Sequence, residues 1–174
     1  MSKKKSKHLE IERRFLLKSI PNVKYNTVLQ IEQYYCEGGY RARCAFNLTK
    51  YYNTGKKKMK YISTLKKKPL NVKLMKNKGK GVNIEIEGEM SKAEFKTMLE
   101  TATLIISKQR HIKKKDGLTW EVDVFTGGMS LVIAEVELKR VNQKVVIPKF
   151  IKDNLIMEVT GIKRFTNRSL AVKI

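Results

Sequence analysis

Four pairs of acidic residues, each with one residue between its members, are the part of this sequence that could do chemistry. The chain has 16 Asp and Glu against 38 Lys and Arg, so acids are scarce. The pairs are Glu10 and Glu12, Glu85 and Glu87, Glu121 and Asp123, and Glu135 and Glu137. Clustered carboxylates raise one another's pKa unless a cation neutralises them. Hard divalent ions such as Mg²⁺ and Mn²⁺ prefer carboxylate oxygen, so the pairs predict metal binding.

Basic residues repeat the same spacing. Arg41 and Arg43 form one such pair, Lys108 and Arg110 form another, and Arg14 continues the spacing of the first acidic pair. A guanidinium offers planar forked donors that match phosphate oxygens. Together, the acids and bases predict binding of a chelated polyphosphate, such as a triphosphate with a divalent metal.

Each of these pairs lies in a short run of alternating apolar and polar residues. Eight such runs cover residues 9–15, 31–35, 40–46, 60–66, 82–90, 104–112, 119–125 and 131–140. Successive strand residues point to opposite faces, so the charges share one face and the apolar side chains the other. An ordinary sheet with a polar solvent face gives a similar pattern. Paired formal charges on six of the eight runs favour a mainly β protein: a closed antiparallel barrel with a charged interior and a few helices outside.

Three helices are expected outside the barrel. Ser91 and Glu94 form a capping box at the start of a predicted helix over residues 91–102. Shorter helices are expected at 148–154 and within 165–173, and Trp120 is expected to pack outward beneath a helix. The segments 51–60 and 77–81 are predicted to be loops.

Length and composition predict one domain in an intracellular compartment. At 174 residues, we expect a single domain over residues 8–174 and a flexible basic arm over 1–7. No apolar run reaches membrane-spanning length, and the N-terminus does not resemble a secretion signal. Cys36 and Cys44 are expected to be unpaired, which fits the cytoplasm. The sequence leaves monomer and homodimer open.

One stretch is strongly basic. Between Gly38 and Asn83 there are fourteen Lys or Arg and no acid. Such a surface attracts RNA or another polyanion, although a merely solvated lysine face gives the same composition.

The ordered motifs resemble the CYTH branch of the triphosphate tunnel metalloenzymes. The resemblance spans about residues 8 to 172 and includes Glu10-x-Glu12-x-Arg14, "IEQYY", "YRAR", "NIEIE", "SKQR", "WEVDVF", "AEVEL" and "EVTGIKRFTNRSLA". It implies an eight-stranded antiparallel tunnel and metal-dependent chemistry on a triphosphate. This chain departs from the family pattern at Arg14, Asn83 and Ile162, where a lysine, an arginine and an aspartate are common.

Roles are carried over at the matching positions. The metal ligands are expected to be Glu10, Glu12, Glu85, Glu87, Glu135 and Glu137. The triphosphate is expected to contact Arg14, Arg41, Arg43, Lys66, Lys108, Arg110 and Arg164. The catalytic residues are expected to be Glu121, Asp123 and Tyr35, with an acid of 121/123 orienting the attacking water.

The expected activity is metal-dependent hydrolysis of the terminal phosphate of a triphosphate, with inorganic tripolyphosphate as substrate and Mg²⁺ or Mn²⁺ as cofactor. The sequence leaves open an RNA 5′-triphosphatase or nucleoside triphosphatase, because the lysine clusters could hold a phosphate backbone. A class IV type adenylate cyclase and a non-catalytic triphosphate or polyphosphate binder also remain open.

Overall fold

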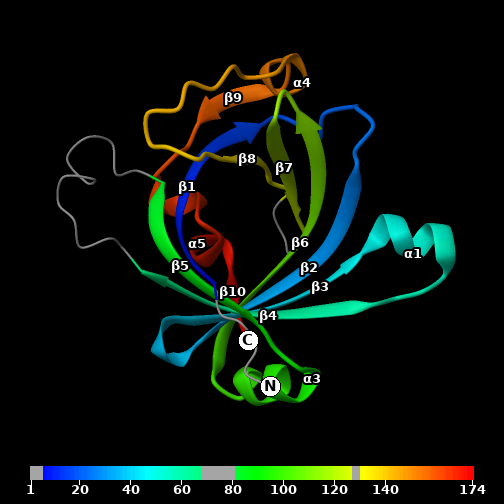
Figure 1. Cartoon of the computed structure of the whole chain (residues 1–174), viewed down its shortest axis with the longest axis vertical. Helices are drawn as coiled ribbons and strands as arrows, with labels where there is room; N and C mark the ends of the chain where they lie inside the picture. Colours follow the sequence, from blue (N-terminus) through cyan, green and yellow to red (C-terminus); the bar gives the residue numbers. More distant parts are fainter. Residues whose placement is uncertain (1–5, 68–80, 127–129) are drawn as a thin grey trace.

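Eight antiparallel strands close into a barrel in the computed structural model, which describes residues 6–67, 81–126 and 130–174 (Figure 1). The strands are β1 (Ser6–Leu17), β2 (Thr27–Cys36), β3 (Tyr40–Asn47), β4 (Met59–Lys67), β5 (Val82–Glu89), β6 (Ala102–Lys115), β7 (Leu118–Phe125) and β8 (Val132–Glu137). Around the barrel the order is β6-β2-β3-β4-β5-β1-β8-β7, and β7 pairs with β6 to close the ring. The predicted eight strands and closed antiparallel barrel are confirmed.

The strand β1 changes neighbours halfway along its length. Its first half, through Ile11, pairs with β5, and its second half pairs with β8 on one side and with the short strand β9 (Leu155–Glu158) on the other. Gly81 lies at the changeover, with φ +77°, and its carbonyl accepts a hydrogen bond from the Glu12 amide at 3.0 Å. A Cβ at Gly81 would lie 2.3 Å from the Glu12 carbonyl oxygen, so only glycine allows this close approach. A tenth strand, β10 (Val172–Lys173), pairs with β6. Neither β9 nor β10 was expected from the sequence.

The predicted helices are present, and one was missed. Helix α3 (Lys92–Leu99) begins with the expected capping box of Ser91 and Glu94, while α4 (Lys149–Lys152) and α5 (Asn167–Leu170) occupy the two shorter predicted positions. Two 3₁₀ turns, η1 (Glu37–Gly39) and η2 (Lys163–Phe165), complete the elements. The prediction of a loop over 51–60 is wrong at both ends, because α1 (Leu48–Thr54), capped by the Asn47 side chain and ended by Gly55, covers residues 51–54 and β4 begins at Met59.

Apolar side chains pack mainly outside the barrel. Trp120, 1 % exposed, lies against Phe15 and under Phe150 of α4, as expected. A second cluster packs α3 against β2 and β3 through Phe95. The interior is not charged throughout, since Phe125 and Ile133 and their neighbours form an apolar plug with η2 and α5 at one end. This closure explains why Figure 1 shows α5 inside the barrel outline.

Two of the predicted segments lie mostly outside the residues that the structure describes. The predicted basic arm lies mostly outside the described residues, and its last two members, Ser6 and Lys7, belong to β1. Most of the predicted loop at 77–81 also lies outside them. Within the described ranges, no helix is long and apolar enough to span a membrane.

Candidate functional site

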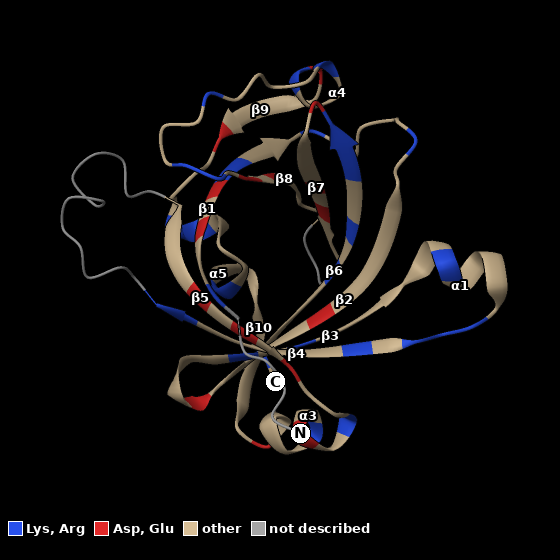
Figure 2. Ribbon diagram, in the orientation of Figure 1, with Lys and Arg blue, Asp and Glu red and all other residues tan. Residues whose placement is uncertain are grey.

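A cavity of about 710 Å³ lies inside the barrel and is lined by the inward face of its strands. Figure 2 shows acidic and basic positions along β1. Glu10, Glu12 and Arg14 lie on its inward face, because alternate residues of a strand share a face. Fourteen of the predicted site residues line this cavity: Glu10, Glu12, Arg14, Tyr35, Arg41, Arg43, Lys66, Glu85, Glu87, Lys108, Arg110, Glu121, Glu135 and Glu137. Asp123 and Arg164 do not.

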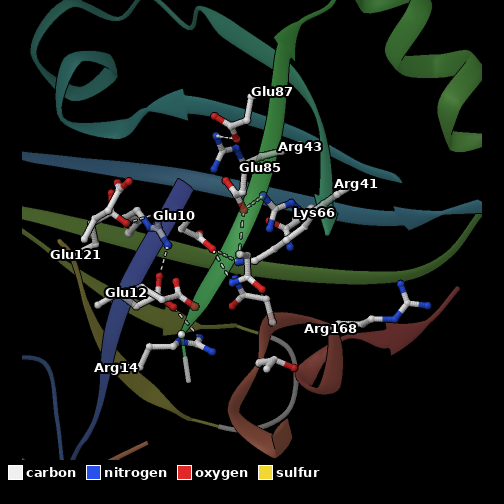
Figure 3. A pocket seen from close by; sticks show the side chains of 18 of the residues that line it. Glu10, Glu12, Arg14, Arg41, Arg43, Lys66, Glu85, Glu87, Glu121 and Arg168 are labelled. Atoms are coloured by element: carbon white, nitrogen blue, oxygen red, sulfur yellow. Dashed lines mark hydrogen bonds and ion pairs between the residues drawn. The ribbon is translucent and has the colours of Figure 1, made fainter. Parts of the chain in front are cut away.

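The first group of charges, called here the β4–β5 cluster, consists of Glu10, Arg41, Lys66 and Glu85 (Figure 3). Lys66 pairs with Glu10 and lies 3.4 Å from Glu85, whose carboxylate also accepts from Arg41 at 3.1 Å. Asn83, at the position where the family commonly has an arginine, donates to Glu10 at 3.0 Å. The Lys66 side chain keeps 31 % exposure, so this cluster borders solvent.

The two carboxylates of the β4–β5 cluster have pKa values shifted in opposite directions. Burial raises the pKa of Glu10, and Lys66 only partly offsets this. Burial opposes ionisation of Glu85 as well, but Arg41 and Lys66 hold the pKa of that carboxyl below its ordinary value. Beyond this cluster, Arg43 Nη2 lies 3.7 Å from Glu87, which also accepts from Thr64 at 3.1 Å.

The second group, called here the β6–β7 cluster, consists of Arg14, Lys108, Arg110, Asp123 and Glu135. Arg110 donates to both oxygens of Asp123 at 2.7 Å and to Glu135 at 2.9 Å. Lys108 also donates to Asp123, and Arg14 Nη2 lies 2.6 Å from Glu135 in an ion pair without hydrogen-bond geometry. Burial opposes ionisation of Asp123, but Arg110 and Lys108 hold its pKa below the ordinary value.

Asp123 therefore points into the barrel but does not line the cavity. The side chain is 0 % exposed, and both its oxygens are engaged by Arg110 and Lys108. The prediction that it orients an attacking water is not supported by this position. Glu121, from the same strand, does line the cavity and pairs with Arg110. Burial raises the pKa of Glu121, partly offset by Arg110.

Glu12 has no such partner. Among the described residues its carboxylate makes no hydrogen bond or ion pair, and burial, reinforced by the charge of Glu135, raises its pKa to about 7. Glu137 lies directly opposite Glu12 across the β1–β8 pairing, and both line the cavity. Like charges directly opposite one another destabilise a sheet, so this position suits a cation.

The six predicted metal ligands do not gather into one cage. Within the described ranges, no three His, Cys, Asp or Glu side chains are arranged to hold a metal ion. Lys or Arg side chains engage Glu10, Glu85, Glu87 and Glu135, which leaves the opposed pair Glu12 and Glu137 as the carboxylates that fit a divalent ion best.

Two guanidinium groups keep an unused donor. Arg14 Nε and Arg41 Nε are buried and lack a hydrogen-bond partner in the described structure. Buried donors without acceptors are costly, and an anion in the cavity would satisfy them.

The C-terminal segment contributes a different arginine from the one predicted. The prediction for Arg164 is wrong, because this side chain lies outside the cavity with its guanidinium over the Phe165 ring. Lys163 and Arg168 line the cavity instead, and the Arg168 guanidinium lies 5.3 Å from the centre of the Tyr35 ring (Figure 3). The sequence motif located this segment, but the turn of η2 decides which of its bases face inward.

Tyr35 is held within the cavity by a hydrogen bond. Its hydroxyl accepts from Gln33 Nε2 at 2.7 Å, and burial raises its pKa, so it remains a proton donor at neutral pH. Gln33 and His8 also line the cavity, and neither was among the predicted site residues.

Comparison with known proteins identifies the family of this chain. The chain is 35 % identical over 122 residues to the inorganic triphosphatase of Acetivibrio thermocellus, covering 63 % of this chain and 76 % of that protein. The chain belongs to the CYTH family of triphosphate tunnel metalloenzymes. No family model matches the sequence. The CYTH barrel superposes on the crystal structure of the inorganic triphosphatase NE1496 with a TM-score of 0.55, 25 % identity and 95 % of both chains covered. The PH1819 protein of Pyrococcus horikoshii shares the fold, with a TM-score of 0.53, 15 % identity and coverage of 75 % and 78 %.

Proposed function

We propose that this CYTH protein hydrolyses the terminal phosphate of inorganic tripolyphosphate with Mg²⁺ or Mn²⁺. The observation that carries the proposal is a single cavity containing both unused phosphate donors, on Arg14 and Arg41, and an unpartnered carboxylate, Glu12. The two inorganic triphosphatases named above support the choice of substrate.

The basic residues bind the triphosphate by exchanging their carboxylate partners for phosphate oxygens. Arg41 and Lys66 now neutralise Glu85 and Glu10, and phosphate oxygens would compete for the same donors. Arg43 and Arg168 extend the cationic lining on either side. Because arginine stays protonated, Arg14 holds a phosphate oxygen and moves no proton.

The carboxylates released by this exchange complete the metal site. Glu12 and Glu137 would hold the ion, and Glu10 would join them as Lys66 turns to the phosphate. The bound ion would lower the charge of the phosphate and the pKa of a coordinated water.

Water then attacks the terminal phosphorus in line with the bridging oxygen, which leaves with pyrophosphate. Glu121 orients the water, and its raised pKa suits a group that accepts the water's proton. The protonated Tyr35 hydroxyl donates to a phosphate oxygen as negative charge develops. The products are orthophosphate and pyrophosphate.

The proposal is tested by measuring phosphate release from tripolyphosphate, ATP and thiamine triphosphate with Mg²⁺, with Mn²⁺ and with chelator. We expect metal-dependent release of one orthophosphate per tripolyphosphate, with pyrophosphate as the second product. The double variant Glu10→Ala with Glu12→Ala should abolish it, whereas Glu158→Gln, on the outer surface, should not. Undiminished release by the double variant would overturn the site assignment.

A further inference from the structure

The segment 47–58 projects from the barrel and takes no part in the proposed reaction. Called here the α1 arm, it consists of Asn47, helix α1 and the four residues that follow the helix. Figure 1 shows it at the far end of β3 and β4, away from the barrel. Every residue from 50 to 58 is exposed. The arm therefore adds little to the core, and its composition reflects some other requirement.

The α1 arm carries uncompensated positive charge. Lys50, Lys56, Lys57 and Lys58 have no acidic partner among the described residues. Figure 2 shows basic positions in blue on α1 and along the approach to β4. The next lysine, Lys60, is different, since its ammonium pairs with Glu89 at 2.7 Å. Four such cations on one short projection attract a polyanion.

Aromatic rings lie between these lysines in a supported series. The rings of Phe46 and Tyr51 lie 6.1 Å apart, those of Tyr51 and Tyr52 5.8 Å apart, and Lys57 Nζ lies 4.4 Å from the centre of the Phe46 ring. Tyr51 is 38 % exposed and Tyr52 is 76 % exposed. One side of the Tyr52 ring thus lies near Tyr51, while the rest of the ring is open to solvent.

We propose that the α1 arm binds single-stranded nucleic acid. Tyr52, supported by Tyr51, stacks on an unpaired base, and Lys56, Lys57 and Lys58 contact the phosphates on either side. Exposed rings beside lysines suit this ligand better than a duplex, whose bases are already stacked. They also suit it better than inorganic polyphosphate, which has no base. The binding does not depend on the proposed hydrolysis.

The test is fluorescence anisotropy of the full chain with a labelled oligouridylate of about 20 nucleotides, longer than one site of this kind. The oligonucleotide has a 5′-hydroxyl, so the result is independent of triphosphatase activity. We expect Tyr52→Ala to weaken binding about 5- to 100-fold, the scale of one base–aromatic stack. Tyr52→Phe, which keeps the ring, should bind like the wild type. The triple variant Lys56→Gln, Lys57→Gln, Lys58→Gln should weaken binding and reduce the slope of log affinity against log salt by about 2.

Matched controls separate a site from general charge. Lys92, Lys96 and Lys144 are exposed elsewhere, so their triple change to Gln removes the same charge, and Tyr40→Ala removes another exposed ring, 44 % exposed. Both should bind nearly as the wild type does. With inorganic polyphosphate, Tyr52→Ala should have no effect. The proposal is overturned if the wild type does not bind the oligonucleotide, if Tyr52→Ala binds as the wild type does, or if the control triple variant loses as much affinity as the arm variant.

Discussion

The two charged clusters on the inner wall use the same residue types and differ in burial and in the number of contacts per charge. In the β6–β7 cluster, Asp123 is fully buried and bound by two cations, one of them through two hydrogen bonds. In the β4–β5 cluster, Lys66 is 31 % exposed, and its second carboxylate partner, Glu85, lies 3.4 Å away. A dense buried network resists rearrangement, whereas loosely paired charges beside solvent can exchange partners with a ligand. The barrel thus contains a rigid charged scaffold and, next to it, a binding surface.

The largest expected effect is loss of stability when the scaffold is broken. Asp123→Ala leaves Lys108 and Arg110 buried without their shared carboxylate, so the free energy of unfolding should fall by about 3–5 kcal/mol. Urea denaturation measures this. Asp153→Ala, which breaks an exposed pair with Lys149, should cost no more than about 1 kcal/mol. A similar cost for both variants would show that the β6–β7 cluster is not a scaffold.

The next effect concerns the binding surface. Arg41→Ala should lower kcat/KM for tripolyphosphate by about 10²- to 10³-fold, the scale of one preorganised donor, with a much smaller change in unfolding free energy. The control is Arg13→Ala, because Arg13 points outward and pairs with Glu158 at 2.7 Å. If both arginine variants keep full activity, Arg41 does not hold the substrate.

A third effect is acid sensitivity of the scaffold. The pKa of Asp123 lies below its ordinary value of 3.8 in the folded protein, so its stabilising contribution is complete at pH values above the unfolded pKa. The contribution disappears as the pH falls through the acid range towards the folded pKa. It is on the order of 2 kcal/mol by the scale of salt-bridged aspartates. Unfolding measured from pH 6 to pH 2 should therefore show a steeper acid decline in the wild type than in Asp123→Asn. Parallel declines would contradict this role.

The smallest expected effect is a gain in stability. Glu12→Gln removes a buried carboxylate that lacks a partner, so in chelator at pH 8 we expect the unfolding free energy to rise by about 1 kcal/mol. Phosphate release should nevertheless fall sharply. Glu137→Gln relieves the same repulsion at an exposed position, so its gain in stability should be smaller. Destabilisation by Glu12→Gln would mean that this carboxylate contributes to the fold.

The sequence predicts the side of the sheet on which a residue lies better than its depth in the barrel. Glu121 and Asp123 are two residues apart on β7, so both point into the barrel, but only Glu121 lines the cavity. Depth depends on the stagger of neighbouring strands, here the register that sets Arg110 opposite Asp123. Periodicity along one strand contains no information about that register.

Local signals explain the other differences. Helix α1 could have been predicted, since Asn47 and Gly55 are standard helix-capping residues at the right separation. The choice between Arg164 and Arg168 could not, because it depends on how η2 and α5 pack against the apolar plug. The strand β9 was hidden for a similar reason: it is only four residues long, and its partner is the second half of β1.

The change of neighbours in β1 ties its two halves to different segments of the chain. Glu10 lies in the half of β1 that pairs with β5, whereas the Arg14 amide donates to Thr160 Oγ1 and the Arg14 carbonyl accepts from Val159, next to β9. The Glu12 amide, hydrogen-bonded to the Gly81 carbonyl, lies between the two. One strand therefore carries an acidic and a basic site residue whose backbone positions are set by segments far apart in the chain, so that correct placement of both depends on the closed barrel.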